Sequence, residues 1–417
     1  MWMVSFFLLA RFSQQIYQSV SLHEFLGEKF GVATRKLAAL CSVIGITYFI
    51  GWEVAVANSA LQSSTVSFVA GAEYGNALLF LALLVAIFYS TTWGRRASGS
   101  VNVWLNFIKI SCLILLLALL GYSFVHHGHS FAALLPKLSE AIAAMGVVGL
   151  LTNIIFNISW QFVDNSSWQS ISSMDTEKRH QSASAIRHAG VLTLLTVNGI
   201  GTLLGALLRP THGVDSTNAL GQIVQSISSL QPIAVIAMIV LIVLSVISLF
   251  DGAILSISQS LVVDLGIRHR NKLTTVKFAR VITLLAGIVS AWGVERIIQS
   301  LGGSIFDMVY IVILTQLCLL GPVLVGLTQK KPSNHMWISI AIGLGTALFV
   351  MLFGIANNNQ VLLQLAGAIV ALVSILSSYG MCLCRVRPKG AVELANERVI
   401  NVVAILVAIE ICYSIKA

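Results

Sequence analysis

Long apolar segments recur along almost the whole chain, and their length restricts what the chain can fold into. A helix needs about 20 apolar residues to cross a bilayer, and about eleven segments reach that length. They are 37–57, 76–92, 103–124, 142–163, 190–208, 232–263, 278–294, 304–328, 336–355, 361–383 and 399–414. A further apolar run at 1–10 is too short to cross, so we expect it to be part of a helix. Because a backbone in lipid must bond to itself, the sequence predicts an all-α polytopic membrane protein.

The composition excludes an ordinary soluble protein. Hydrophobic residues make up 57% of the 417 residues and charged residues only 10%, whereas a soluble domain has about 25% charged residues. No connection between the apolar segments is long enough for a soluble domain, so we expect one transmembrane domain over 1–417, embedded in a lipid bilayer. The net charge of +9 comes from basic connections beside the membrane, and we expect no nucleic-acid partner.

Lys and Arg residues are concentrated in alternate connections between the apolar segments. One side of the predicted membrane holds Arg11, Lys29, Arg35, Lys36, Arg95, Arg96, Lys178, Arg179, Arg187, Arg268, Arg270, Lys272, Lys277, Arg280, Lys330, Lys331, Arg385, Arg387, Lys389 and Arg398. The other side holds only Lys137, Arg209, Arg296 and Lys416. Cytoplasmic connections carry the excess of basic residues. We therefore expect the first side to be cytoplasmic and the membrane to be the plasma membrane, which in bacteria is the inner membrane.

One apolar segment carries a carboxylate near its middle. Ser245, Ser248 and Asp251 are spaced three residues apart, so on a helix they follow one another along one side. A charged group at membrane depth is costly, and it usually faces a protein interior, a water-filled cavity or a partner ion. We predict that these residues bind a cation.

A lysine lies inside another span. Lys109 is about 10 Å from the start of segment 103–124, at 1.5 Å per residue. Its amine could reach back to the cytoplasmic surface, or it could form a charge pair with Asp251 inside the membrane. The sequence leaves both alternatives open.

Two segments carry polar residues that could line a solute pathway. Segment 37–57 contains Tyr48, Trp52 and Glu53, and Glu53 could instead be satisfied by neighbouring polar groups. Segment 142–163 contains Asn153, Asn157 and Gln161 on one helical face. Amides in a membrane helix either join helices or line a cavity. We predict that these six residues contact the solute.

Motifs of membrane enzymes and nucleotide-driven pumps are not found. The sequence has no nucleotide-binding loop, zincin helix, nucleophile elbow, or haem or iron–sulfur spacing. Its cysteines lack metal-ligand spacing. We expect no enzyme activity, no cofactor and no metal, with a sodium ion as the one candidate exception.

Three stretches resemble the solute:sodium symporter family. They are SLHEFLGEKFG at 21–31, FVDNSSWQSISS at 162–173 and SLFDGAILSISQSLVVDLG at 248–266. The first is similar to a cytoplasmic loop of the family, the second to the stretch after its sixth core helix, and the third to its eighth core helix. Order and spacing agree from residue 1 to about residue 328.

The resemblance implies a fold of two inverted five-helix repeats, with solute and sodium meeting near the bilayer midplane. It places residues 1–10 at the end of the second core helix, so the core over 1–328 lacks the first core helix, and 329–417 are additional helices. Where relatives have two adjacent hydroxyl residues, this chain has Ser248 and Leu249. Asp251 stands where some relatives have a serine of a sodium site, and Asn106 where relatives have an aspartate.

The function implied is secondary active transport: cation-coupled, sodium-driven symport of a small polar organic solute by alternating access. Two readings of the coupling remain. Either Asp251 binds sodium with Ser248, or Lys109 takes the place of the ion and transport is proton-coupled or uncoupled. An inactive fragment and a membrane sensor of the same fold are further alternatives. The solute could be an amino acid, urea, a carboxylate or a sugar.

Overall fold

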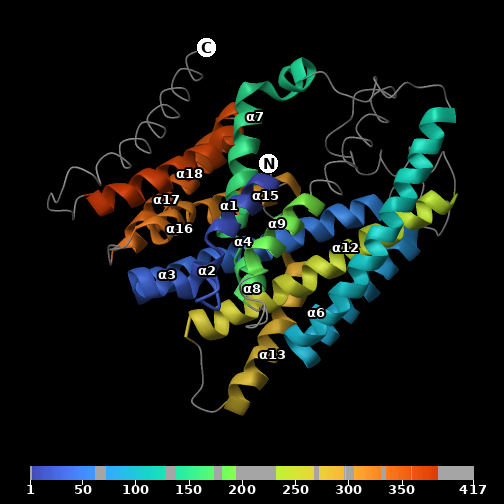
Figure 1. Ribbon diagram of the computed structural model, residues 1–417, viewed down its shortest axis with the longest axis horizontal. Coiled ribbons are helices and arrows are strands. Elements are labelled where there is room, and N and C mark those ends of the chain that lie inside the picture. Colours follow the sequence, from blue (N-terminus) through green and yellow to red (C-terminus); the bar gives the residue numbers. More distant parts are fainter. Residues whose placement is uncertain are drawn as a thin grey trace. The chain divides into compact units, whose positions relative to one another are not determined.

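The computed structural model describes residues 2–61, 72–126, 138–172, 181–193, 232–266, 272–294, 296, 305–329, 335–357 and 359–383. Every regular element among these residues is a helix (Figure 1). Eight of the helical segments are long and apolar enough to cross a membrane: Val32–Leu61, Ala77–Gly94, Ser100–Leu119, Ile233–Asp264, Thr275–Gly293, Ile311–Thr328, Met336–Gly354 and Val361–Leu383. The predicted all-α polytopic membrane protein is therefore confirmed.

Most of the predicted spans coincide with these helices, and two differ from expectation. Segment 142–163 lies in α7 (Leu138–Val163), which is broken at Gly146. The positive φ of 68° at Gly146 is a conformation that suits glycine. Segment 304–328 was expected to be one helix, but it consists of α15 (Ile305–Leu317) and α16 (Leu320–Thr328), joined by a turn. Segment 399–414 and most of 190–208 lie outside the described residues.

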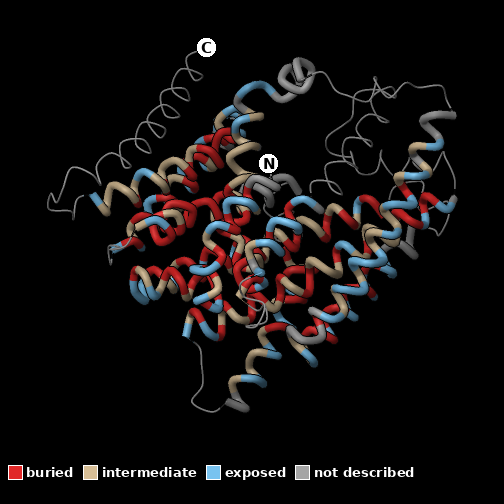
Figure 2. Tube along the Cα trace, in the orientation of Figure 1, coloured by how far each residue is buried: buried red, intermediate tan, exposed pale blue. Residues whose placement is uncertain are grey.

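The chain divides into two compact units, each built from separate stretches of sequence. Unit 1 comprises 1–42, 141–187 and 310–417, and unit 2 comprises 43–140 and 188–309. The prediction of a single domain over 1–417 stays a prediction, as do the number of helices and the inverted repeat. Within the described residues, each span has buried and exposed positions along its length (Figure 2).

Unit 1 contains the two resembling stretches 21–31 and 162–173, and they pack against each other. The further helices of this unit are α1 (Trp2–Arg11), α2 (Ser13–Ile16), α3 (Leu22–Phe30), the start of α4 (Val32–Leu61), α8 (Asn165–Ser172), the start of α9 (Ser182–Thr193), α17 (Met336–Ala356) and α18 (Gln360–Leu383). The backbone N–H of Leu22 donates to Asn165 Oδ1 at 3.0 Å. The rings of Phe25 and Trp168 lie 5.0 Å apart. Helix α3 therefore has a buried face against α8.

Capping interactions fix where the two short helices begin. The Ser21 hydroxyl accepts from the Glu24 backbone N–H at 3.0 Å, and the Glu24 carboxylate accepts from the Val20 N–H. A hydroxyl followed three residues later by Glu is the pattern of a capping box. Asp164 plays the same part for α8, because its carboxylate accepts from the backbone N–H groups of Ser166 and Ser167.

Small polar residues join the last helices of unit 1. The Ser374 hydroxyl on α18 accepts from the Gly321 N–H at 3.0 Å and donates to the Cys318 carbonyl at 2.7 Å. The Ser339 hydroxyl on α17 shares a hydrogen bond of 2.6 Å with that of Ser378. Small residues let membrane helices approach closely and bond through hydroxyls. These contacts hold α16, α17 and α18 together.

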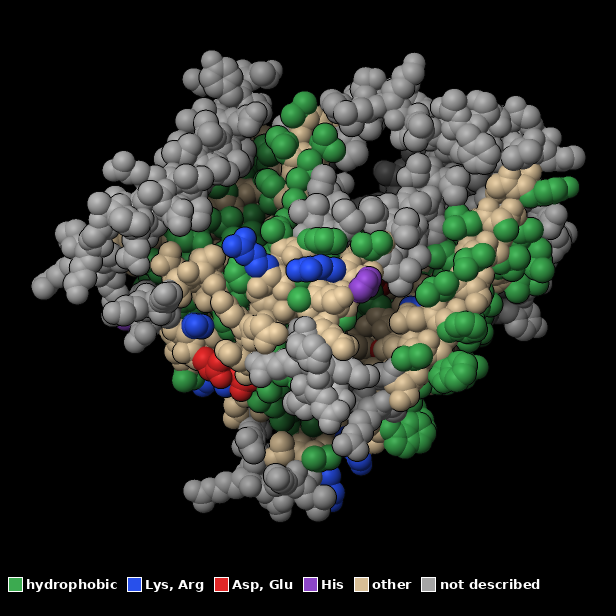
Figure 3. All heavy atoms as spheres, viewed as in Figure 1, with side chains coloured by type: hydrophobic (Ala, Val, Ile, Leu, Met, Phe, Trp, Pro, Cys, Tyr) green, Lys and Arg blue, Asp and Glu red, His purple; other side chains and the backbone are tan. Residues whose placement is uncertain are grey.

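Unit 2 is organised around α12 (Pro232–Gln259), which packs extensively against α6 (Ala72–His126). The π-helix η6 (Ser260–Asp264) continues α12, and the π-helix η7 (Val289–Gly293) continues α13 (Lys272–Ile288). One apolar core joins α4, α6, α12 and η7. Apolar side chains also gather on the outward face of α6 (Figure 3), as expected for a helix in contact with lipid.

Candidate cation site

A break in α6 brings two parts of that helix to one position on α12. Gly94 has φ 63° and ψ −150°, a conformation that a residue with a Cβ adopts only under strain. Tyr89 lies before the break, whereas Ser98 and Asn102 lie after it. Side chains from both halves of α6 therefore reach Asp251 near the middle of α12.

Asp251 is fully buried, with 0% of its surface exposed, and its carboxylate is surrounded by neutral donors. The Tyr89 hydroxyl donates to Oδ2 at 2.7 Å. The Asn102 amide nitrogen lies 3.2 Å from Oδ1 and 3.4 Å from Oδ2. The Ser98 hydroxyl and the Gly252 backbone N–H also bond to the carboxylate. These hydrogen bonds offset much of the cost of burying the charge.

Asn102 connects Asp251 to a second residue of α12. Its amide nitrogen faces Asp251, and its Oδ1 accepts from the Ser248 hydroxyl at 2.7 Å. The same nitrogen lies 3.4 Å from the Ser98 hydroxyl. We use the name Asp251 cluster for Tyr89, Ser98, Asn102, Ser248 and Asp251. The cluster combines one carboxylate with four neutral oxygen-bearing side chains, which are suitable ligands for a hard cation.

Lys109 lies on the same side of α6 as Asn102 but two turns further on, about 10 Å along the helix axis. Lysine side chains on a helix lean toward its N-terminus, which here is the direction of Asn102. Lys109 is half-buried, and its positive charge is attracted to Asp251. The hydrogen bonds to Asp251 come from neutral groups, namely side chains of the cluster and the Gly252 backbone N–H. A direct charge pair between Lys109 and Asp251 stays a prediction.

Two predicted site residues lie away from the cluster. Ser245 on α12 and Asn106 on α6 are both exposed. A helix turns by about 100° per residue, so Ser245 lies about 120° around α12 from Asp251. The spacing of three residues therefore drifts around the helix, and only Ser248 joins Asp251. The cation-binding role of Ser245 and the coupling role of Asn106 stay predictions.

The predicted solute-contacting residues belong to different units. Tyr48, Trp52 and Glu53 are half-buried on the part of α4 that belongs to unit 2. The indole nitrogen of Trp52 is buried and has no hydrogen-bond partner among the described residues. A buried donor without a partner is costly, so a polar ligand at this position would remove that cost.

The remaining solute predictions fall on α7 in unit 1. Gln161 Oε1 accepts from the Ser167 hydroxyl at 2.8 Å, so this amide supports the junction with α8. Asn157 is half-buried and has a polar partner. The side chain of Asn153 lies outside the described residues. Contact of these residues with a solute stays a prediction.

Unit 1 has a second buried polar site that the sequence did not indicate. The Gln316 amide nitrogen donates to the Ser42 carbonyl at 3.5 Å, just before the turn between α15 and α16. Gln316 Oε1 and the Ser42 hydroxyl are buried without a partner among the described residues. Broken membrane helices occur where freed polar groups line a site or are buried in protein. Among the residues that the structure describes, no cluster of His, Cys, Asp or Glu could hold a metal ion.

Sequence reasoning missed the contribution of α6 to the Asp251 cluster. Tyr89 and Asn102 lie at the ends of two predicted spans that are separated by a short connection containing Gly94. Such adjacent ends must be close in space, and this could have indicated that both residues reach the same neighbour. Which neighbour they reach depends on packing against α12, and no local pattern specifies it.

The fold is similar to those of solved structures. One of them is a substrate-bound, outward-open state of a Na+-coupled sialic acid symporter, with a TM-score of 0.62 and 13% sequence identity. The similarity covers 94% of this chain and 84% of that chain. No family model matches the chain, and no curated protein matches it in sequence. The chain therefore has the fold of a helical secondary transporter.

Proposed function

We propose that this chain is a secondary transporter of the solute:sodium symporter family that moves a small polar organic solute together with a sodium ion bound at the Asp251 cluster. The observation that carries the proposal is the complete burial of Asp251 on α12, where the Tyr89 hydroxyl and the Asn102 amide nitrogen of α6 donate to its carboxylate. A buried carboxylate in a membrane helix marks an ion pathway by default.

The cluster can supply a cation with oxygen ligands after small rearrangements. At present the Tyr89 hydroxyl and the Asn102 amide nitrogen point hydrogens at the carboxylate. Rotation of the Asn102 amide by about 180° exchanges its nitrogen for Oδ1, and a hydroxyl can turn its lone pair toward a cation. The same side chains can therefore satisfy Asp251 without an ion and coordinate the ion when it enters.

Side chains of α6 supply oxygen atoms in place of a hydroxyl that is missing from α12. The family resemblance expects adjacent hydroxyl residues on this helix, but Leu249 has no side-chain oxygen. Ser98 and Asn102 approach Asp251 from α6 and bring two oxygens in its place. Support also comes from the similar fold of the Na+-coupled sialic acid symporter, whose structure was reported to reveal a novel Na+ site.

Proton-coupled or uncoupled transport is the second candidate, and the half-buried position of Lys109 on the side of α6 that carries Asn102 favours it. In that case the lysine amine replaces the sodium ion, and solute movement does not respond to sodium. Removal of one member of a buried charge pair leaves the other uncompensated. If Lys109→Ala restores transport to an Asp251→Asn variant, the two charges form a pair.

Counterflow in proteoliposomes tests the proposal. The purified chain is assayed with an amino acid, urea, a short carboxylate, a sugar and sialic acid, each with a sodium gradient, a pH gradient or neither. We expect a sodium gradient to drive uptake of at least one solute, and Asp251→Asn to abolish it while the protein stays inserted. Uptake that responds only to pH favours the second candidate. No sodium or pH dependence for any solute contradicts both and favours an inactive fragment or a sensor.

A further inference from the structure

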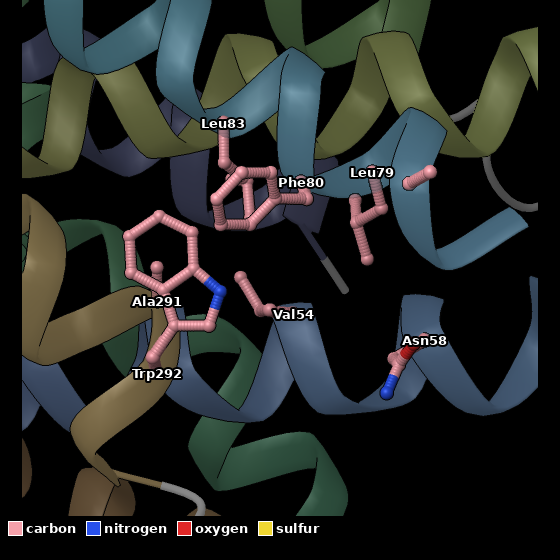
Figure 4. A pocket seen from close by; sticks show the side chains of 8 residues that line it. Val54, Asn58, Leu79, Phe80, Leu83, Ala291 and Trp292 are labelled. Carbon is pink, nitrogen blue, oxygen red and sulfur yellow. The ribbon is translucent and has the colours of Figure 1, made fainter. Parts of the chain in front are cut away.

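A cavity of about 340 Å³ lies in unit 2, separate from the residues of the Asp251 cluster. Ligand sites in proteins typically have volumes of about 300–1,000 Å³, with mostly apolar walls and a few polar groups. Three elements supply the walls, α4, α6 and the π-helix η7 (Figure 4). The lining residues are Val54, Asn58, Ala77, Leu79, Phe80, Leu83, Ala291 and Trp292.

The side chains that line the cavity favour an uncharged ligand that is mostly apolar. Among the described residues, no charged side chain lines the cavity, and Asn58 supplies the one amide. The rings of Phe80 and Trp292 lie 5.2 Å apart and form one aromatic wall, with Asn58 at the opposite end of the cavity (Figure 4). An apolar chain can therefore lie against the rings while a hydrogen-bonding group meets the amide.

The position of Trp292 depends on a local departure from the α-helix. Residues Val289–Gly293 form a π-helix at the end of the span that begins in α13. A π-helical turn shifts the side chains that follow it around the helix axis, and such turns occur frequently at functional sites. Here the π-helical turn contains both Ala291 and Trp292, which line the cavity.

The cavity has a buried inner wall and an exposed apolar rim. Leu79 and Leu83 are buried, with 4% and 1% of their surfaces exposed, and form its inner wall. Phe80 at the rim is 49% exposed, and the neighbouring Leu81 is 59% exposed. The rim thus continues the apolar outward face of α6. An apolar rim of this kind suits a molecule that enters from the hydrocarbon of the bilayer.

All three walls come from the ends of membrane spans. Asn58 lies one turn before the end of α4 at Leu61, Ala77 is the first residue of its span, and Trp292 is next to the last residue of its span at Gly293. Span ends lie at the membrane interface, about 15 Å from the midplane. The ester groups of glycerolipids lie at that depth, next to their acyl chains.

We propose that this cavity binds a glycerophospholipid, with one acyl chain lying against the aromatic wall of Phe80 and Trp292 and an ester carbonyl that accepts a hydrogen bond from the Asn58 amide. The neutral walls match the uncharged ester and chain, while the charged headgroup stays outside in the interface. The site is independent of cation coupling, because none of the residues of the Asp251 cluster lines it.

Photolabelling tests the proposal. The full chain is reconstituted in phosphatidylcholine vesicles that contain a phosphatidylcholine with a diazirine in one acyl chain, irradiated, digested and analysed by mass spectrometry. We expect labelling to concentrate on the peptides that carry Phe80 and Trp292. Ala77 is exposed at the rim, so Ala77→Trp fills the mouth of the cavity without disturbing the core, and labelling at Trp292 is lost. The matched control Leu81→Trp, on the same helix but outside the cavity, keeps it.

A second variant tests the polar contact and does not depend on filling the cavity. Asn58→Ala should raise the photolipid concentration for half-maximal labelling by about tenfold, the factor for one hydrogen bond of roughly 1.4 kcal/mol. Labelling that is as strong at the exposed Leu352 of α17, which does not line the cavity, as at Trp292 overturns the proposal. Labelling that is unchanged in both Ala77→Trp and Asn58→Ala overturns it too. So does labelling of Trp292 by a water-soluble aromatic photoprobe when the photolipid does not label it.

Discussion

Replacing Tyr89 by Phe removes one hydroxyl from the Asp251 cluster and leaves the ring in place. The deleted hydrogen bond is 2.7 Å long and ends on a carboxylate that is 0% exposed, so water does not take over its role. A hydrogen bond to a charged group contributes about 1.5–3 kcal/mol to stability. Three neutral donors remain on Asp251, so we expect Tyr89→Phe to lower the free energy of unfolding by about 2 kcal/mol.

The matched control is Tyr379→Phe in unit 1. Tyr379 also loses a single hydrogen bond, but its partner is the neutral hydroxyl of Thr328 at 3.0 Å, and the contact is exposed. A neutral, exposed bond contributes about 0.5–1 kcal/mol. Both variants are measured by reversible unfolding in mixed detergent micelles, where the difference between them isolates the contribution of the buried charge.

A double-mutant cycle tests whether Asp251 is a charged acceptor of the Tyr89 hydrogen bond. In an Asp251→Asn background, Tyr89→Phe should cost only about 0.5–1 kcal/mol, because the acceptor has become neutral. If Tyr89→Phe costs no more than Tyr379→Phe in the native background, Asp251 is not a charged acceptor within the cluster. The reasoning that makes it a cation ligand then fails.

Three further substitutions have definite expected outcomes. Gly321→Ala places a Cβ against the backbone of α18 and should lower the free energy of unfolding by about 3 kcal/mol. In the control Gly345→Ala the new Cβ has no neighbour within 4 Å, so this variant should be slightly more stable than the native protein. Equal effects of the two variants in unfolding measurements would contradict the packing of α16 against α18. Ser248→Ala should weaken sodium binding by about tenfold, because Ser248 belongs to the Asp251 cluster. Ser245→Ala, on the exposed side of α12, should leave sodium binding unchanged. Calorimetric titration with sodium measures the affinity of both variants. Gly94→Ala places a residue with a Cβ in a left-handed conformation, which costs about 1–3 kcal/mol. The variant should bind sodium more weakly, because the two halves of α6 no longer hold Tyr89 and Asn102 against Asp251. Unaltered sodium binding would show that the break does not position the site.

The sequence predicted the helical membrane fold because length and apolarity decide it locally. Spans such as 336–355 and 361–383 need only enough apolar residues to cross a bilayer, and both are helices within a residue or two of expectation. Breaks were harder to predict. The turn at Cys318 and Leu319 lies just before Gly321 and Pro322, and Pro322 has no N–H to bond the Cys318 carbonyl four residues earlier. The expectation of one helix over 304–328 passed over this signal, and the Ser374 hydroxyl on α18 bonds that carbonyl instead.

The candidate site could be predicted only in part. Asp251 stands out in any sequence because a carboxylate in an apolar run is costly, and the structure places it at the centre of a polar cluster. Its partners Tyr89 and Asn102 do not stand out, since both lie near predicted span ends where polar residues are common. Ser245 is not part of the Asp251 cluster, because each step of three residues turns the helix by about 60° away from Asp251, and its cation-binding role stays a prediction.

Sodium binding to the purified chain tests the central claim most directly. Titration with sodium in a buffer whose other cation is bulky measures the ion without knowledge of the solute. We predict saturable binding to the native chain. Asp251→Asn should bind at least about a hundredfold more weakly, because removing one side of a buried charge interaction costs about 3–5 kcal/mol. Equal sodium affinity in the native chain and in Asp251→Asn would contradict the account.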